Sequence, residues 1–204
     1  MKNLYNYNLT CFLTSAPNVN YLPGDSSIEI AFVGYSNSGK STLINTLTNQ
    51  KKLARTSKIP GCTQFINLFE VTSGIRLVDL PGYGYAAVPR VLKHCLKQTI
   101  KEYLQTRSNL KGLVVLMDIR HPFKKLDQQI VQWAVNMNMP MLLLLNKADK
   151  LSLRKQEEQL SQTRIMLGTL IGNFQVEVFS SLQKKGMDKL QQTLEKWISD
   201  NKES

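Results

Sequence analysis

Short apolar runs alternate with longer amphipathic segments along most of the chain. The short runs have the length and composition of buried strands, whereas the longer segments repeat apolar residues at helical spacing. Strands are expected at residues 28–33, 65–71, 75–78, 113–117, 141–145 and 176–179. Helices are expected at residues 41–48, 92–105, 126–135, 153–170 and 187–198.

This alternation predicts an α/β fold with a mostly parallel, six-stranded sheet. Helices should cover both faces, because parallel strands need crossover connections that pack back onto the sheet. A chain of 204 residues can form one domain with a full core. We expect residues 27–204 to form this domain and residues 1–26 to be an N-terminal appendage.

The first expected strand leads directly into the sequence GYSNSGKS. In it Gly34, Gly39, Lys40 and Ser41 form the pattern G-x-x-x-x-G-K-S. The glycines let backbone N–H groups close around phosphate oxygens at the start of a helix, where the helix dipole also favours an anion. Lys40 is predicted to reach the β- and γ-phosphates, and Ser41 to hold Mg²⁺. The loop alone leaves ATP and GTP equally open.

A second motif selects the base. Asn146, Lys147 and Asp149 form the pattern N-K-x-D after an apolar strand, at the edge where open α/β sheets bind ligands. The Asp149 carboxylate can accept hydrogen bonds from guanine N1–H and the 2-amino group, and adenine offers neither donor in that geometry. The Lys147 stem can lie over the base, and Ser180 and Ser181 can offer backbone N–H groups to the guanine oxygen. GTP is therefore the predicted ligand.

Two further loops are predicted to sense the γ-phosphate. Asp79 begins the sequence DLPG and is placed to reach Mg²⁺ through water, while the Gly82 N–H can touch the γ-phosphate. Thr63 precedes an expected strand and suits a second protein ligand of Mg²⁺, although an ordinary strand-edge threonine is the alternative. Both loops would lose their anchors when the γ-phosphate leaves, which predicts a nucleotide-driven switch.

Five segments together resemble one family. AFVGYSNSGKSTLIN, ARTSKIPGCTQFIN, LVDLPGYGYAAV, VVLMDIRHPFKKLD and FSSLQKKGMDKL are similar to the EngB-type (YihA/YsxC) bacterial GTP-binding proteins of the TrmE/Era-like group, over about residues 28–190. The resemblance implies a Ras-like P-loop GTPase domain with GTP and Mg²⁺, a role in assembling the large ribosomal subunit, and a link to normal cell division and septation. Cys62 departs from the basic residue usual in the family, and Asn146 from a frequent threonine.

The predicted nucleotide site combines these motifs. Its metal ligands are Ser41 and Thr63. The residues predicted to contact the nucleotide are Gly34, Tyr35, Ser36, Asn37, Ser38, Gly39, Lys40, Ser41, Gly61, Cys62, Thr63, Gln64, Phe65, Asp79, Leu80, Pro81, Gly82, Asn146, Lys147, Ala148, Asp149, Phe179, Ser180 and Ser181.

The residue after the D-x-x-G glycine is Tyr83, where many small GTPases have a water-positioning glutamine. We therefore expect slow hydrolysis by the isolated protein, stimulated by potassium or by the ribosomal partner. In related GTPases that lack the glutamine, an asparagine at the position of Asn37 helps to hold potassium, although a polar loop filler is the alternative. The predicted catalytic residues are Lys40, Thr63, Gly82 and Asn37.

The net charge of +11 points to a polyanionic partner, nucleic acid or an anionic membrane surface. No Asp or Glu occurs in residues 30–69 or 80–101. Both acid-free spans adjoin the predicted switch loops, and both carry basic residues: Lys40, Lys51, Lys52, Arg55 and Lys58 in the first, and Arg90, Lys93, Lys97 and Lys101 in the second. Tyr83 and Tyr85 could stack on unpaired RNA bases or pack against the domain.

Other classes fit the sequence less well. No segment is apolar for long enough to span a bilayer, and the three scattered cysteines favour a reduced cytosol over disulfides or a zinc site. We expect a cytoplasmic monomer that binds the large ribosomal subunit or its precursor through ribosomal RNA. A nucleotide-gated module of the division apparatus without RNA is the alternative, and a P-loop kinase has no use for N-K-x-D.

Overall fold

The computed structural model describes residues 4–54, 65–84, 89–168, 170 and 172–202. Its strands are β1 (Cys11–Ala16), β2 (Ile28–Gly34), β3 (Ile66–Thr72), β4 (Ile75–Asp79), β5 (Leu110–Asp118), β6 (Met141–Asn146) and β7 (Phe174–Val178). Its α-helices are α1 (Lys40–Leu47), α2 (Arg90–Thr106), α3 (Lys125–Asn136), α4 (Leu153–Leu167) and α5 (Met187–Asp200). Three short 3-10 helices are η1 (Tyr7–Leu9), η2 (Val19–Tyr21) and η3 (Ala148–Lys150).

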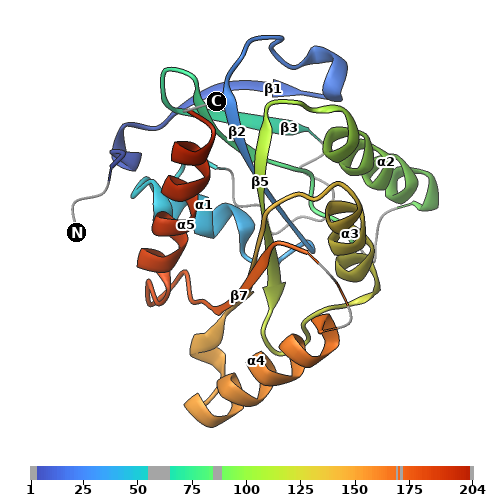
Figure 1. Ribbon diagram of the computed structural model, residues 1–204, viewed down its shortest axis with the longest axis vertical. Helices are drawn as coiled ribbons and strands as arrows, with labels where there is room; N and C mark the ends of the chain where they lie inside the picture. Colours follow the sequence, from blue (N-terminus) through green and yellow to red (C-terminus); the bar gives the residue numbers. More distant parts are fainter. Residues whose placement is uncertain (1–3, 55–64, 85–88, 169, 171, 203–204) are drawn as a thin grey trace.

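One sheet has the strand order β1-β3-β4-β2-β5-β6-β7 (Figure 1). The strands β4, β2, β5, β6 and β7 run parallel, and β3 and β1 add antiparallel pairs at one edge. The expected α/β class with a mostly parallel sheet is confirmed, but the count of six strands was wrong by one. The additional strand is β1, whose residues are mostly exposed. An edge strand buries little, so its sequence lacks the alternation that marks a half-buried strand.

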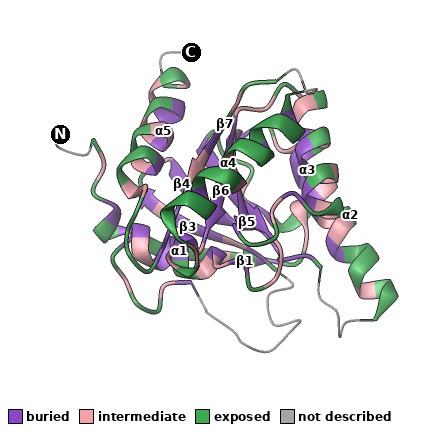
Figure 2. Ribbon diagram, turned by 90° about the horizontal axis from the view of Figure 1, so that it is seen from below, coloured by how far each residue is buried: buried purple, intermediate pink, exposed green. Residues whose placement is uncertain are grey.

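Helices cover both faces of the sheet, as predicted. Apolar residues of α2, α3 and α4 pack on one face, and apolar residues of α1 and α5 pack on the other. The strands between these layers are almost continuously buried (Figure 2); every residue of β2, β4 and β6 is buried. This two-sided burial explains why these strands read as unbroken apolar runs rather than as alternating ones. No helix in the described part of the chain is both long and apolar enough to cross a membrane.

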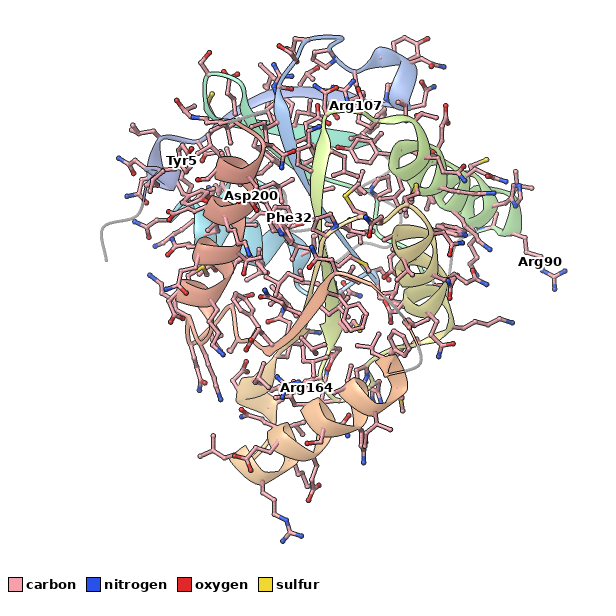
Figure 3. The ribbon with its side chains drawn as sticks, viewed as in Figure 1. Tyr5, Phe32, Arg90, Arg107, Arg164 and Asp200 are labelled. Carbon is pink, nitrogen blue, oxygen red and sulfur yellow. The ribbon has the colours of Figure 1, made fainter. Side chains whose placement is uncertain are left out.

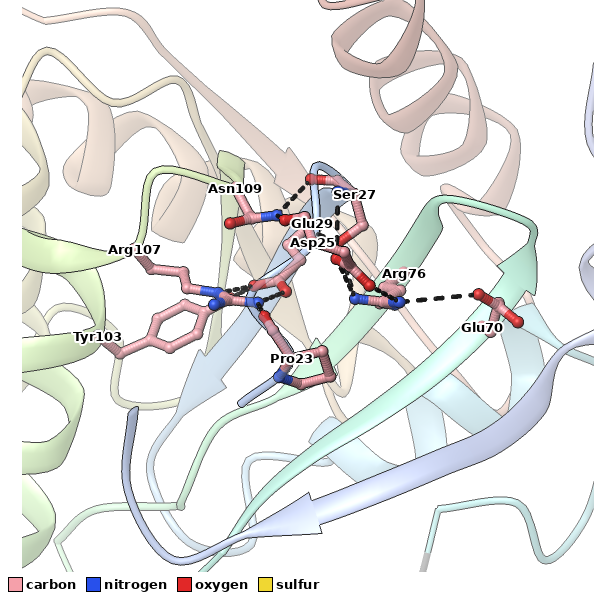
Figure 4. A network of polar contacts seen from close by, with 9 residues as sticks. All are labelled: Pro23, Asp25, Ser27, Glu29, Glu70, Arg76, Tyr103, Arg107 and Asn109. Atoms are coloured by element: carbon pink, nitrogen blue, oxygen red, sulfur yellow. Dashed lines mark hydrogen bonds and ion pairs between the residues drawn. The ribbon is translucent and has the colours of Figure 1, made fainter. Parts of the chain in front are cut away.

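A buried polar network fixes the amino end of β2 (Figure 4). Glu29 is fully buried, and it accepts hydrogen bonds from the Tyr103 hydroxyl at 2.7 Å and from Arg107 Nε at 2.9 Å. Arg76 pairs with Asp25 and lowers the pKa of that carboxyl to about 2. A buried charge without its partner costs several kcal/mol, so these contacts hold the end of α2 and the segment before β2 in place. The phosphate loop lies at the other end of the same strand.

Candidate nucleotide-binding site

The glycine-rich loop lies between the carboxyl end of β2 and the first turn of α1, as the sequence predicted. Gly39 caps α1 with a φ of 101°, a left-handed conformation that favours glycine. A Cβ atom at Gly39 would also lie only 2.3 Å from Asn146 Nδ2. Both the backbone conformation and the close approach therefore require glycine here. The N–H groups at the start of α1 are available in the orientation that binds anions.

Lys40 and Asp79 form an ion pair between the phosphate loop and the end of β4. Lys40 is 7% exposed and Asp79 is 2% exposed. β2 and β4 are neighbours, and Phe32 pairs with Asp79 in their register, which brings the two side chains together. The sequence predicted phosphate contacts for Lys40 and a water-mediated metal contact for Asp79. The structure shows that, in this state, the two groups form an ion pair with each other.

The N-K-x-D residues are tied to the phosphate loop by their side chains. Asn146 Nδ2 donates a 2.8 Å hydrogen bond to the Ser38 carbonyl oxygen, and Lys147 Nζ donates a 2.6 Å hydrogen bond to that of Asn37. Lys147 has a φ of 66° and precedes η3. The base-reading segment and the phosphate loop therefore form one connected unit, although 108 residues separate Ser38 from Asn146.

Asp149 remains available as an acceptor. Its Oδ1 atom accepts a 2.7 Å hydrogen bond from the Ser180 hydroxyl, and this bond lowers the pKa of Asp149 below its ordinary value. The carboxylate is therefore ionised at neutral pH, which the predicted bidentate contact with guanine requires.

The backbone N–H groups of Ser180 and Ser181 differ from the expectation that they are open to the base. Ser180 N–H donates to the Lys185 carbonyl oxygen at 3.1 Å, and Ser181 N–H donates to Asn146 Oδ1 at 3.2 Å. A turn closes between Ser180 and Lys185 and takes up the first donor. Sequence position alone could not reveal these local partners.

Asp118 is a site residue that the sequence analysis left without a role. It belongs to the segment DIRH, and its Oδ2 atom lies 3.1 Å from Lys147 Nζ and 2.7 Å from Arg120 Nη2. Burial alone would raise the pKa of Asp118, but hydrogen bonds from Arg120 and Lys147 outweigh it and lower the pKa. β5 and β6 pair Asp118 with Asn146. Asp118 thus holds the Lys147 side chain beside the phosphate loop.

Tyr83 packs inside the domain. It is 4% exposed, its ring lies edge-on to that of Tyr35 with centroids 4.7 Å apart, and its hydroxyl donates to Asp127 Oδ1 at 2.5 Å. Its carbonyl oxygen accepts the Ser36 N–H at 2.7 Å. Of the two alternatives for this residue, packing against the domain is correct. Tyr83 joins the phosphate loop to the first turn of α3.

Several predicted positions lie outside the described residues: Arg55, Lys58, Gly61, Cys62, Thr63, Gln64 and Tyr85. Phe65 is described and is 46% exposed. Across the described ranges no three His, Cys, Asp or Glu side chains gather into a group that could hold a metal. A hydroxyl such as that of Ser41, in the first turn of α1, fits Mg²⁺ that is held mainly by phosphate oxygens and water.

The family model described as "50S ribosome-binding GTPase" matches residues 29–147. The "Probable GTP-binding protein EngB" of Sodalis glossinidius is 63% identical over 199 residues, which is 98% of this chain and 94% of the relative. The protein of the same name from Pectobacterium carotovorum is 59% identical over the same shares. The chain belongs to the EngB family of GTP-binding proteins.

Solved structures agree on the fold of this EngB chain. A crystal structure of a probable GTP-binding protein engB aligns with a TM-score of 0.70 at 22% identity, over 85% of this chain and 100% of that one. A structure of Era aligns with a TM-score of 0.65, also at 22% identity, over 84% of this chain and 57% of that one. The Ras-like P-loop GTPase fold, GTP binding and membership of a GTPase family are thereby confirmed.

The buried carboxyl of Asp127 predicts a pH dependence of stability. Burial raises the pKa of Asp127 to about 6, above the ordinary value near 4 for an unfolded chain. Between pH 4 and 6 the native state keeps a proton that the unfolded state loses, so this group makes the free energy of unfolding fall as the pH rises, by about 2–3 kcal/mol. Asp127→Asn should remove this decrease in the free energy of unfolding, because an amide side chain does not titrate in this pH range.

Urea unfolding at pH 4.5 and 7.5 measures the effect as the difference between wild type and variant. Asp188→Asn, at an exposed carboxyl on α5, is the matched control and should keep the wild-type pH dependence. An Asp127→Asn protein with the wild-type pH dependence would show that Asp127 does not hold a proton in the native state.

Proposed function

We propose that this EngB protein is a cytoplasmic, monomeric GTPase that acts as a nucleotide-driven switch in assembly of the large ribosomal subunit. By family resemblance it would also be linked to normal cell division and septation. The proposal rests on the connection between the nucleotide site and the basic helix α2. The basic helix α2 follows closely on the D-x-x-G loop, and Tyr83 in between is bonded to the phosphate loop.

The nucleotide contacts proposed for the described residues follow from their placement. The N–H groups of the phosphate loop surround the phosphates, Lys147 lies along the base and Asp149 reads its edge. Mg²⁺ would be held by Ser41 and Thr63 and would supply charge neutralisation at the β- and γ-phosphates. Lys40 would then exchange Asp79 for phosphate oxygens, and Asp79 would turn to a metal-bound water. The Gly82 N–H would contact the γ-phosphate, so the position of the D-x-x-G loop would depend on whether the γ-phosphate is present.

Slow hydrolysis is part of the proposal. The Tyr83 hydroxyl is committed to Asp127, and a phenol in this position does not replace the glutamine of other small GTPases. Lys40, Thr63, Gly82 and Asn37 are the proposed catalytic residues. Asn37 has a φ of 64°, which asparagine tolerates better than most residues, so its backbone conformation gives one reason for asparagine that does not involve potassium.

Asp149→Asn should shift base preference from guanine to xanthine. Xanthine presents a carbonyl where guanine presents its 2-amino group, and an amide can donate where a carboxylate only accepts. Loss of a buried charged contact of this kind lowers affinity by about two orders of magnitude or more. Competition of GTP and xanthosine triphosphate for bound fluorescent GDP measures the preference. Unchanged preference for GTP would remove Asp149 from base recognition.

Potassium should accelerate GTP hydrolysis through the Asn37 side chain. The comparison is turnover in potassium chloride and sodium chloride at equal ionic strength, for wild type and Asn37→Gly. Glycine accepts the positive φ of this position, so the variant removes the amide without straining the loop. Equal wild-type rates in the two salts would exclude the potassium role, and stimulation that survives in Asn37→Gly would exclude Asn37.

The partner proposal rests on the charge of α2. Arg90, Lys93, Lys97 and Lys101 recur along the helix with one acid, Glu102, near its end. Figure 3 shows Arg90 extending away from the domain at the start of α2. A helix with four cations and an acid-free first three turns favours a polyanion such as ribosomal RNA. The matched family model is described as ribosome-binding, and the Era structure is a complex with 16S ribosomal RNA, which supports the same class of partner.

A nucleotide-gated module of the division apparatus is the second candidate, and it needs no RNA. The two candidates differ in salt dependence, because phosphate contacts release counterions.

Binding to large ribosomal subunits should be tighter with a non-hydrolysable GTP analogue than with GDP. Each neutralised phosphate should add about 0.7–0.9 to the slope of log affinity against log salt. Reversal of Lys93, Lys97 and Lys101 to Glu should weaken binding and flatten this slope, while GTP affinity stays nearly unchanged. Co-sedimentation across a salt series in both nucleotide states measures these effects. An affinity that does not change with salt concentration would exclude RNA as the partner. An affinity that is equal with the GTP analogue and with GDP would exclude the switch.

A further inference from the structure

An apolar cavity of about 310 Å³ lies between α2 and α3. Leu96 and Ile100 line it from α2, and Ile130 and Trp133 line it from α3. Tyr83 and Gly84 close the end nearest the D-x-x-G loop. Small-ligand sites have volumes from about 300 Å³ upward and are mostly apolar with a few placed polar groups. The cavity therefore has the size and lining of a small-molecule site.

The polar side chains that line the cavity are basic or neutral. Lys93, His94 and Lys97 line it, and its lining contains no Asp or Glu among the described residues. Lys97 Nζ lies 5.7 Å from the centroid of the Trp133 ring. Gln129 also lines the cavity, and its Oε1 atom is buried without a hydrogen-bond partner in the described structure. A buried acceptor without a partner costs free energy that a ligand donor would recover.

We infer that this cavity binds a small aromatic organic anion that carries an N–H or O–H donor. The apolar walls take the ring system, the cationic rim takes the negative charge, and Gln129 Oε1 takes the donor. Unpaired nucleic-acid bases are a poorer match, because the Lys97 ammonium already lies over the Trp133 ring on which a base would stack. The cavity residues are distinct from those of the nucleotide site, but Lys93 and Lys97 belong both to the cavity and to the basic face of α2 proposed for RNA.

The wall formed by Tyr83 couples the cavity to the nucleotide site. Tyr83 N–H donates to the Gly34 carbonyl oxygen at 3.3 Å, and Ser36 N–H donates to the Tyr83 carbonyl oxygen at 2.7 Å. A ligand in the cavity touches the residue that the phosphate loop holds at both its backbone groups. We therefore expect the ligand to bind with different affinity in the two nucleotide states, and by linkage to change nucleotide affinity by the same factor.

The probe that matches all three features is 8-anilinonaphthalene-1-sulfonate, which has two aromatic groups, a sulfonate and a secondary amine. Its neutral counterpart, N-phenyl-1-naphthylamine, has the same body without the sulfonate. Both fluoresce on entering apolar sites, so titration of the full-length, GDP-loaded protein gives an affinity and a stoichiometry for each. We expect one saturable site for each probe.

Three variants assign that site. Leu126→Trp places a larger side chain at a half-buried position in the lining and should abolish binding of both probes. Lys97→Glu should weaken the anionic probe about tenfold, by loss of attraction and gain of repulsion, and change the neutral probe less than about twofold. Lys101→Glu is the matched control, since Lys101 is also half-buried on α2 but does not line the cavity, and it should leave both affinities unchanged.

The opposite results overturn the inference. Binding that survives Leu126→Trp, or that falls equally with Lys97→Glu and Lys101→Glu, would place the probe elsewhere on the surface. The titration is repeated with a non-hydrolysable GTP analogue, and equal affinity in the two nucleotide states would refute the coupling through Tyr83. GDP affinity and circular dichroism of each variant show that a loss of binding is not a loss of folding.

Discussion

The position of the phosphate loop at the carboxyl edge of a parallel sheet is the constraint on which the other features of the site depend. Three residues from other parts of the chain bind the phosphate loop. Asn146 and Lys147 do so by side-chain hydrogen bonds, and Tyr83 by backbone hydrogen bonds. Parallel pairing of β2 with β4 and β5, and of β5 with β6, brings all these strand ends to the same edge. The site is thus a consequence of strand register, because a shift of one residue would separate these contacts.

The same strand register explains why the strand positions and the placement of the motif residues could be predicted from the sequence. Apolar runs identified the six strands β2 to β7 within a few residues, and the helix expected at 92–105 is observed at Arg90–Thr106. Motif residues needed only their order after each strand, since the carboxyl ends of parallel strands meet at one edge. The strand β1 escaped prediction because its side chains, including Phe12 at 54% exposure, lie mostly in solvent.

Pairings between distant residues were beyond sequence reasoning. Asp118 was visible only as part of a family motif, and nothing in its local sequence indicates that it contacts Lys147 from a neighbouring strand. The Tyr83 hydroxyl bond to Asp127 depends on how the first turn of α3 packs under the D-x-x-G loop. The N–H groups of Ser180 and Ser181 are satisfied by a turn and by Asn146. Each case is a tertiary contact that sets the chemistry of a residue whose type alone allows several roles.

The ion pair between Lys40 and Asp79 links phosphate binding to the stability of the fold. Both groups are buried, so removing the lysine leaves a buried carboxylate without a partner, which typically costs about 3–5 kcal/mol. A Lys40 variant therefore loses stability as well as a phosphate contact, and a loss of GTP binding has two causes. Asp149 avoids this problem, because its neighbours Ser180 and Lys150 do not depend on it for burial of a charge. Base recognition is consequently the part of the site where a single substitution separates ligand binding from folding.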